Sequence, residues 1–361
     1  MVEVLRGSRL SLGPKMEEFE HAMARYIGTD CAVAVSSGTA GLHLCIRALG
    51  VGEGDEVIVP SFTFVAAANA IRYERATPVF VDVDAVMLNL DPERIEAAIT
   101  PRTRAILVVH TFGCPAEMEA ILEIARRRKL LVIEDACEAI GAEYRGRKVG
   151  RFGDAAAFAF YPNKQITTGE GGMVVTRDEA LAKRIRALRN QGRYDGSEWL
   201  QHRELGYNYR LSEMNCALGV AQLSRIDEIL KARDAVARKY DDLLRETLEL
   251  HVPVIDPSRR KVSWFVYVAR LGTDYSLAER DAIAQQLTAD GIACGKYFAP
   301  IHLQPSYSEW RHRAKLPVSV SAGERVLALP FFNRISDGEI EYVCERLKAA
   351  VSGVVGCRRK K

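Results

Sequence analysis

Lys164 is the residue of this sequence whose setting most clearly suggests chemistry. It lies in Ala-Phe-Tyr-Pro-Asn-Lys-Gln-Ile, on a short loop that follows the apolar run 155–160. Upstream, Asp135 ends the segment Val-Ile-Glu-Asp. A shielded lysine amine can form a Schiff base with an aldehyde, and a carboxylate can hold the proton of an aromatic ring nitrogen. The two residues together predict Schiff-base chemistry on an aldehyde cofactor.

Gly38 and Thr39 form the second feature, a short turn between a strand at 32–35 and a helical segment at 40–49. The first amides of a helix have no partner within the helix and carry partial positive charge, so small residues there can admit a phosphate. The same residue types also cap helices for structural reasons alone. The turn therefore indicates a phosphate site only in combination with the downstream residues.

Phe64 follows another apolar strand and is expected to begin a helix, where its ring could lie flat on an aromatic cofactor. A core aromatic side chain is the alternative. Asp135 could likewise be a helix cap, and the glycine-rich turn 167–172 also fits a plain hairpin. The order of phosphate turn, aromatic ring, acid and lysine is nevertheless hard to explain by packing alone.

Short apolar segments alternate with amphipathic helical patterns through the first two thirds of the chain. The expected strands cover residues 32–35, 56–59, 78–81, 105–109 and 130–133, and the segment 118–128 has helical periodicity. Alternation of this kind predicts an α/β fold with a buried, largely parallel sheet. Ligands of such sheets bind beyond the carboxyl ends of the strands, which is where Asp135 and Lys164 are expected.

A chain of 361 residues is long enough for two lobes, and we place their boundary near residue 250, with a large domain at 1–250 and a small one at 251–361. The helical pattern at 211–246 is too long for one ordinary helix and suits a crossing between lobes. Beyond the boundary, a strand at 262–271 and helices at 277–289 and 337–351 are expected.

The composition excludes several classes of protein. Hydrophobic residues make up 48% of the chain and the net charge is +3, too small to grip nucleic acid along a whole face. No apolar stretch is long enough for a membrane helix, so we expect no membrane association and a cytoplasmic location. The eight cysteines form no Cys-x-x-Cys pair or His/Cys cluster, which argues against a metal site.

Six ordered motifs give the chain a resemblance to one known family, from about Leu12 to the last helix. They are Ser37-Gly38-Thr39, Pro60-Ser61-Phe62-Thr63-Phe64, Glu134-Asp135-Ala136, Phe160-Tyr161-Pro162-Asn163-Lys164, Gly206-Tyr207-Asn208-Tyr209-Arg210 and Ile301-His302-Leu303-Gln304-Pro305. In these the chain resembles the DegT/DnrJ/EryC1/StrS sugar aminotransferases, which use pyridoxal 5'-phosphate. The resemblance implies an aspartate-aminotransferase-like fold of type I, with a mostly parallel seven-stranded sheet in the large domain and a smaller C-terminal α+β domain.

The resemblance also implies roles for individual residues. Lys164 would link covalently to the cofactor, Asp135 would pair with its ring nitrogen, and Phe64 would stack on the ring. The remaining cofactor contacts would be Gly38 and Thr39 at the phosphate, Glu138 beside the ring oxygen, and Asn208 reaching the phosphate of the neighbouring subunit. A homodimer with shared active sites follows from that last role. Ala159 departs from the family pattern, because many relatives have a serine that adds one phosphate contact.

The resemblance implies a reaction as well. Dehydratases of the group carry histidine in place of the lysine, so Lys164 favours transamination. The expected donor is L-glutamate, and the expected acceptor is a keto sugar linked to a nucleotide. The loop 199–202 is similar to members of the perosamine-synthase type, which aminate carbon 4 of 4-keto-6-deoxyhexoses. Amination at carbon 3, a keto-inositol acceptor and a non-catalytic regulatory homologue are the alternatives.

Three further residues are candidates for substrate binding. His302 lies on a proline-rich loop from which it could reach over the cleft toward the sugar, although a lone histidine is as often a packed group. Arg193 belongs to a polar loop that could cover a nucleotide or could simply be solvated. Arg210 could bind the donor's carboxylate as a bidentate partner, or could brace the contact between subunits.

Overall fold

The computed structural model of the chain describes residues 1–196, 198, 200–311, 313 and 315–358, with side chains described as far as residue 354. Trp199, the first residue of the loop that resembles the perosamine-synthase type, lies outside the described residues.

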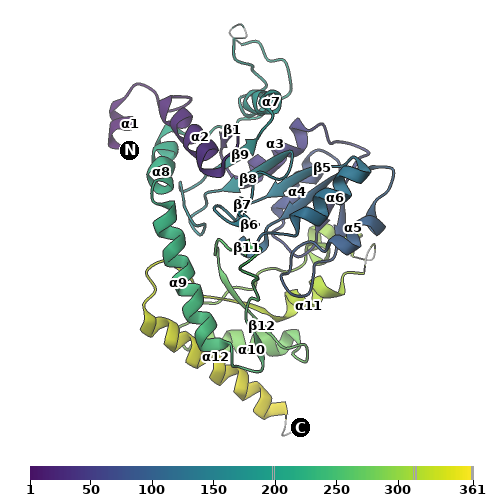
Figure 1. Ribbon diagram of the computed structural model, residues 1–361, viewed down its shortest axis with the longest axis vertical. Helices are drawn as coiled ribbons and strands as arrows, with labels where there is room; N and C mark the ends of the chain where they lie inside the picture. The colour runs from purple at the N-terminus through teal and green to yellow at the C-terminus, as the bar shows by residue number, and fades with distance from the viewer. Residues whose placement is uncertain (197, 199, 312, 314, 359–361) are drawn as a thin grey trace.

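A seven-stranded sheet forms the centre of the molecule (Figure 1). Its strands, in spatial order, are β1 (Cys31–Val35), β9 (Gly172–Thr176), β8 (Ala155–Ala159), β5 (Leu131–Asp135), β4 (Thr103–Val109), β2 (Glu56–Pro60) and β3 (Thr77–Val81). Only β9 runs antiparallel to its neighbours; every other strand points the same way. The expected mostly parallel seven-stranded sheet is confirmed.

Helices cover both faces of this sheet because side chains of each strand alternate between the two faces. In β4, Ala105, Leu107 and Val109 pack on one side, whereas Ile106 and Val108 pack on the other. The first face is covered by α3 (Gly38–Ala48), α4 (Ala66–Tyr73) and α7 (Glu179–Arg189). The opposite face is covered by α2 (Pro14–Ile27), α5 (Pro92–Ala98), α6 (Met118–Arg128) and α8 (Glu213–Leu223).

The helical pattern predicted at 211–246 is divided into two helices. α8 ends at Leu223 and α9 (Ile226–Leu244) begins after Ser224 and Arg225. Together they run along one side of the molecule from the large sheet to the C-terminal elements (Figure 1). The second half of α9, including Tyr240 and Leu244, is buried in the C-terminal core.

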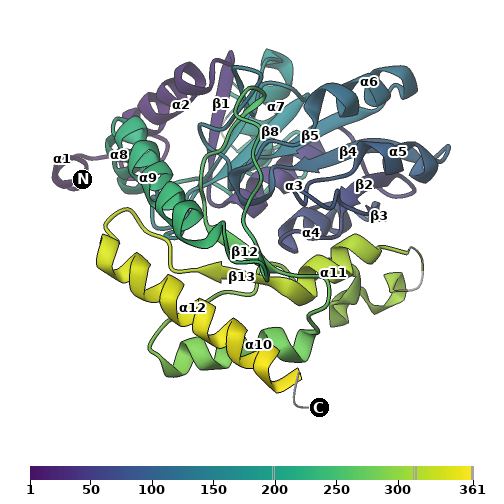
Figure 2. The same cartoon turned by 60° about the horizontal axis from the view of Figure 1, so that its bottom comes forward.

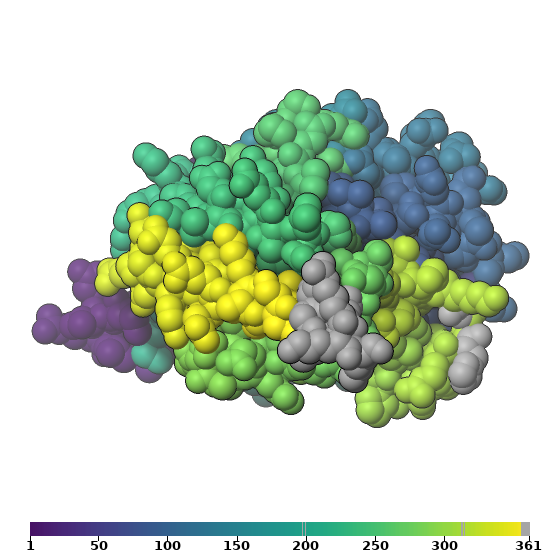
Figure 3. All heavy atoms as spheres, turned by 90° about the horizontal axis from the view of Figure 1, so that it is seen from below, coloured from purple at the N-terminus to yellow at the C-terminus, as the bar shows by residue number. Residues whose placement is uncertain are grey.

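The C-terminal part has an antiparallel sheet of β10 (Leu250–His251), β12 (Tyr267–Leu271) and β13 (Val326–Leu329). Helices α10 (Leu277–Ala289), α11 (Pro317–Arg325) and α12 (Asp337–Arg358) pack with it (Figure 2). Seen from below, α12 lies across the surface beside α10 (Figure 3). The predicted domain boundary near residue 250 falls at the start of β10 and stays a prediction.

The strand predicted at 262–271 is shorter than expected. Residues 260 and 261 form a separate strand, β11 (Arg260–Lys261), which pairs with the hairpin of β6 (Glu143–Tyr144) and β7 (Arg147–Lys148). A segment that follows α9 in the chain is thereby joined to a hairpin that lies between β5 and β8 in the sequence. The remaining elements are α1 (Val2–Arg6) and the 3-10 helices η1 (Thr111–Gly113), η2 (Ile301–Leu303) and η3 (Pro305–Trp310).

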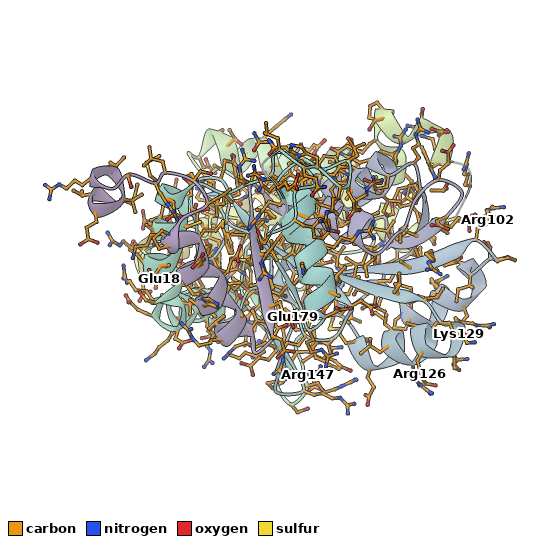
Figure 4. The ribbon with its side chains drawn as sticks, turned by 90° about the horizontal axis from the view of Figure 1, so that it is seen from above. Glu18, Arg102, Arg126, Lys129, Arg147 and Glu179 are labelled. Carbon is orange, nitrogen blue, oxygen red and sulfur yellow. The ribbon has the colours of Figure 1, made fainter. Side chains whose placement is uncertain are left out.

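Charged side chains are spread over the surface. Arg102, Arg126 and Lys129 lie at one edge of the molecule and point outward (Figure 4). Within the described residues, no helix is both long and apolar enough to cross a membrane.

Gly113 permits a close approach between the loop after β4 and the segment that follows β11. Its φ is +83°, and an added methyl group would collide with the carbonyl of Ser263, whose N–H donates to the Gly113 carbonyl at 3.0 Å.

We expect Gly113→Ala to lower the free energy of unfolding by about 3 kcal/mol or more, because the clash involves rigid backbone. Gly50→Ala is the matched control, since Gly50 has φ +75° with open space around it. Its expected cost is about 1 to 2 kcal/mol. Equal losses in thermal unfolding would contradict the role assigned to Gly113.

Candidate active site

The carboxyl ends of β1, β2, β5 and β8 meet at one edge of the sheet, and a cavity of about 410 Å³ lies there. Six of the predicted residues line it together: Gly38, Thr39, Phe64, Asp135, Glu138 and Lys164. Parallel pairing explains this meeting, because it brings the ends of strands that are far apart in the sequence to a common edge.

Lys164 presents its amine inside the cavity. The side chain is only 13% exposed, and its Nζ lies 3.5 Å from Oε1 of Glu138. The amine also lies 4.0 Å from the centre of the Phe265 ring, so the ring face stabilises a positive charge there. The loop that carries Lys164 turns back on itself, since the Lys164 N–H donates to the Tyr161 carbonyl at 2.9 Å. The lysine is therefore held in the site.

Asp135 provides a buried carboxylate in the same cavity. Its Oδ1 accepts a hydrogen bond from the Cys137 N–H at 3.1 Å. Burial raises the pKa of Asp135, while hydrogen bonds from Cys137 and the positive charge of Lys164 lower it; burial prevails and the pKa lies above its ordinary value. A cationic group placed beside Asp135 would favour its ionised form.

The end of strand β5 is held in place by Glu134, which is fully buried behind the cavity. The carboxylate accepts backbone N–H groups of Gly150, Phe152 and Gly153 at 2.8 Å each, and lies 3.1 Å from Nε2 of His110. Burial acts to raise the pKa of Glu134, but His110 and the backbone donors outweigh it, and the pKa lies below its ordinary value. This network fixes the backbone from which Asp135 projects.

The N-terminus of α3 forms another wall of the cavity. Ser37 caps the helix by accepting the Ala40 N–H at 3.0 Å, as the sequence suggests. A methyl group on Gly38 would lie 2.7 Å from Cβ of Ala159 and 2.8 Å from Sγ of Cys137, so only glycine fits. Ala159, the departure from the family pattern, thus borders this turn. The first amides of α3 are available to an anion in the cavity.

Aromatic rings line the other side of the cavity. Phe64 is 59% exposed and lies 6.5 Å from Phe298, measured between ring centres. It precedes α4, which begins at Ala66, so the expectation that Phe64 begins the helix is wrong. Sequence reasoning missed Phe265, Tyr297 and Phe298, which come from the C-terminal part and belong to no motif. Only the fold brings them to the site.

The remaining predicted residues do not line the cavity. His302 is 3% exposed, and its Nδ1 lies 2.6 Å from the hydroxyl of Ser61. Burial lowers the pKa of His302 below its ordinary value. Asp82 opposes this shift, and Arg311 adds to it. The histidine therefore lies behind the loop of Thr63 and Phe64 instead of reaching over the cleft, and any role in binding the sugar stays a prediction.

Three predicted residues lie on neighbouring segments away from the cavity lining: Arg193, Asn208 and Arg210. Asn208 is exposed, between Tyr207 and Tyr209, whose stacked rings have centres 4.9 Å apart. Arg210 donates to the side-chain oxygens of Asn190 and Gln191, each at 2.9 Å. Arg193 is half-buried on the loop that follows Asn190 and Gln191. Their predicted roles stay predictions.

We expect Glu134→Gln to lower the free energy of unfolding by about 3 kcal/mol at pH 7, because it removes the charge from a buried and fully bonded carboxylate. The folded-state pKa of Glu134 lies below its ordinary value, so its stabilisation is complete above pH 4 to 5 and is lost as the pH falls through the folded-state pKa. Denaturant unfolding at pH 7 and pH 3.5 measures the difference, which should shrink in acid. The control is Glu179→Gln, an exposed carboxylate labelled in Figure 4, with an expected change below about 0.5 kcal/mol. A loss independent of pH would contradict this account.

Comparisons with known proteins agree with this geometry. GDP-perosamine synthase from Caulobacter vibrioides is 44% identical over 340 residues, which cover 93% of this chain and 90% of that protein. Among solved structures, DesV of S. venezuelae is 39% identical with a TM-score of 0.90, and the match covers 96% of this chain and 92% of the DesV chain. Spr1654 of Streptococcus pneumoniae, in its PLP-form, is 28% identical with a TM-score of 0.93, and the match covers 98% of this chain and 95% of the Spr1654 chain. These structures confirm the expected fold class. The model of the DegT/DnrJ/EryC1/StrS aminotransferase family matches residues 1–348, and the chain belongs to this family.

Proposed function

We propose that this chain uses pyridoxal phosphate to move an amino group from L-glutamate to carbon 4 of a nucleotide-linked 4-keto-6-deoxy sugar. The observation that carries the proposal is the buried pair of Lys164 and Asp135 in one cavity of an aminotransferase-family chain. The likeness to GDP-perosamine synthase supports carbon 4 and a sugar acceptor.

Pyridoxal phosphate is the cofactor of this enzyme family, and the cavity fits it. The fit rests on a shielded amine at Lys164, a buried carboxylate at Asp135 and a helix N-terminus where Gly38 leaves no room for a side chain. When bound, the cofactor supplies an aldehyde carbon that carries the amino group and a ring that withdraws electrons.

Each wall of the cavity would hold one part of the cofactor. The first amides of α3, with Thr39, would bind the phosphate, and the exposed ring of Phe64 would face the cofactor ring. Asp135 would keep a proton on the ring nitrogen, since a buried carboxylate is stabilised by a cation beside it. Glu138 would lie close to the reacting end, because it is the neighbour of Lys164.

Lys164 would bind the cofactor and then move protons at its Nζ while the amino group is transferred. The position suits this role because the side chain is almost fully shielded from water, which limits proton exchange with solvent. His302 would act indirectly, by holding Ser61 and therefore the loop of Thr63 and Phe64. Arg193 and Arg210 are proposed to contact substrate groups that extend beyond the cavity.

We further propose a homodimer in which Asn208 completes the site of the partner. The side chain is exposed and lies outside the cavity of its own chain. Exposed apolar side chains lie near this segment. Leu205 is 75% exposed and precedes Asn208 by three residues, and Tyr73 is 54% exposed and packs on His43, which also contacts Tyr207. Exposed apolar residues near a polar group are consistent with a surface that a second copy covers.

We expect the aminated cofactor form of the protein to react with one member of a panel of keto sugars carrying GDP, UDP or dTDP, and the GDP-linked 4-keto sugar is the favoured acceptor. Recovery of the visible absorbance of the covalently linked cofactor measures the reaction. Lys164→Ala should abolish both that absorbance and turnover. Restoration by a keto-inositol, with no response to any nucleotide sugar, would refute the assigned acceptor, and normal turnover of Lys164→Ala would refute the mechanism.

Mixing two inactive variants tests the shared site. Lys164→Ala and Asn208→Ala dimers should each have little activity, because each lacks one component of every site. After random exchange of subunits, half of the dimers are mixed and each contains one intact site, so about a quarter of the wild-type activity should return. Activity that stays at the level of the unmixed variants would contradict the homodimer with shared sites.

A further inference from the structure

Glu138 has a carboxylate that is engaged on both oxygens inside the cavity. Oε1 lies 3.5 Å from Nζ of Lys164, and Oε2 accepts the N–H of Phe112 at 3.0 Å. The backbone is fixed as well, because Nε2 of Gln165 donates to the Glu138 carbonyl at 2.6 Å. With 7% of the residue exposed, the carboxylate has a set position beside the lysine amine.

The charges in the cavity make this pair unusual. Among the described residues that line it, Lys164 is the one basic side chain, whereas Asp135, Glu138 and Glu170 carry carboxyl groups, and the other ionisable side chains are Cys137, Tyr161 and Tyr297. Burial raises the pKa of Glu138, and the negative charge of Asp135 adds to this effect. Lys164 and the Phe112 N–H lower the pKa, but burial prevails and the pKa lies above its ordinary value. A carboxyl of this kind can hold a proton nearer to neutral pH than an exposed glutamate can.

An amine must lose a proton before it can attack an aldehyde, because an ammonium group has no free electron pair. We propose that Glu138 is the base that takes this proton from Lys164 when the lysine attaches to the cofactor aldehyde. The proton moves from Nζ to Oε1, and the amine forms a bond to the aldehyde carbon. The aldehyde oxygen leaves as water with the two remaining amine protons, and Glu138 ends as a neutral acid.

The inference rests on the proposed function and predicts that the proton count of attachment differs between the wild type and Glu138→Gln. In the wild type the proton passes to Glu138 within the cavity, so attachment should release fewer protons to solvent than the same step in Glu138→Gln. In Glu138→Gln the proton must go directly to solvent, and the step must proceed without an internal base. Loss of a general base typically slows a step by about a hundredfold or more.

The experiment uses the full-length protein freed of cofactor. Stopped-flow absorbance follows attachment of pyridoxal phosphate, borohydride reduction with peptide mass spectrometry identifies the modified lysine, and a pH indicator in weak buffer counts released protons. Glu138→Gln should attach at least about a hundredfold more slowly than the wild type at pH 7. Glu138→Asp, which keeps a carboxylate, should recover part of the rate. Glu179→Gln is the control, because Glu179 is an exposed carboxylate of α7 that does not line the cavity, and its rate and proton count should equal those of the wild type.

The wild-type rate should also fall in acid as Glu138 becomes protonated, whereas the Glu138→Gln rate should lack that limb of the pH profile. Equal rates and equal proton counts in the wild type and Glu138→Gln overturn the role of Glu138. If Glu138→Gln does not fold, a wild-type rate of attachment that does not fall in acid overturns it alone. Absence of any modified Lys164 in the wild type would instead refute the proposed function, and this inference with it.

Discussion

Parallel strand pairing is the constraint on which the site depends. β4, β5 and β8 lie side by side with their carboxyl ends together, so Asp135 at the end of β5 is next to the loop that follows β8. The turn after β1 joins the same edge through the one antiparallel strand, β9. Gly172 at the start of β9 has room only for hydrogen, because a methyl group would meet the backbone of Ser37. The lysine, the acid and the helix N-terminus therefore come together from three distant parts of the sequence.

Burial of opposite charges then gives this edge its chemistry. Lys164 is shared between the ring of Phe265 and the carboxylate of Glu138, whereas Asp135 is buried and forms no ion pair with another of the described residues. Buried carboxylates are stable when they are paired or accept several hydrogen bonds. Glu134 satisfies that condition within the chain, since three backbone donors and His110 surround it. Asp135 accepts one backbone bond at 3.1 Å, which leaves it suited to a positively charged ligand.

Much of this architecture could be predicted from the sequence because local signals are strong where strands are buried and helices are capped. The helix predicted at 277–289 has those bounds in the structure, where Ser276 and Glu279 form a capping box. The motifs around Lys164 and Asp135 were sufficient to place both residues in one cavity. Local patterns did not reveal the break at Ser224 and Arg225, since both residues are compatible with helix.

Long-range packing explains the parts of the site that the sequence did not reveal. Phe265, Tyr297 and Phe298 are apolar residues of the C-terminal part, and such residues are predicted as core whether or not they face a cavity. For His302, the proline-rich loop left two possibilities, a side chain that reaches over the cleft and a packed histidine. The hydroxyl of Ser61, which is 241 positions away, holds it below the surface. Contacts of this kind depend on the complete fold and leave no periodic signal.

The small strand β11 has a mechanical consequence. Residues 260 and 261 pair with the hairpin of β6 and β7, and Arg233 of α9 donates to the carbonyl groups of Trp264 and Phe265 at 2.5 and 2.7 Å. The segment that carries the Phe265 ring to the lysine is thus attached on two sides, although it comes late in the chain. Because Phe265 stacks against Tyr297, with ring centres 6.2 Å apart, the same attachment also fixes where the later aromatic rings stand in the cavity.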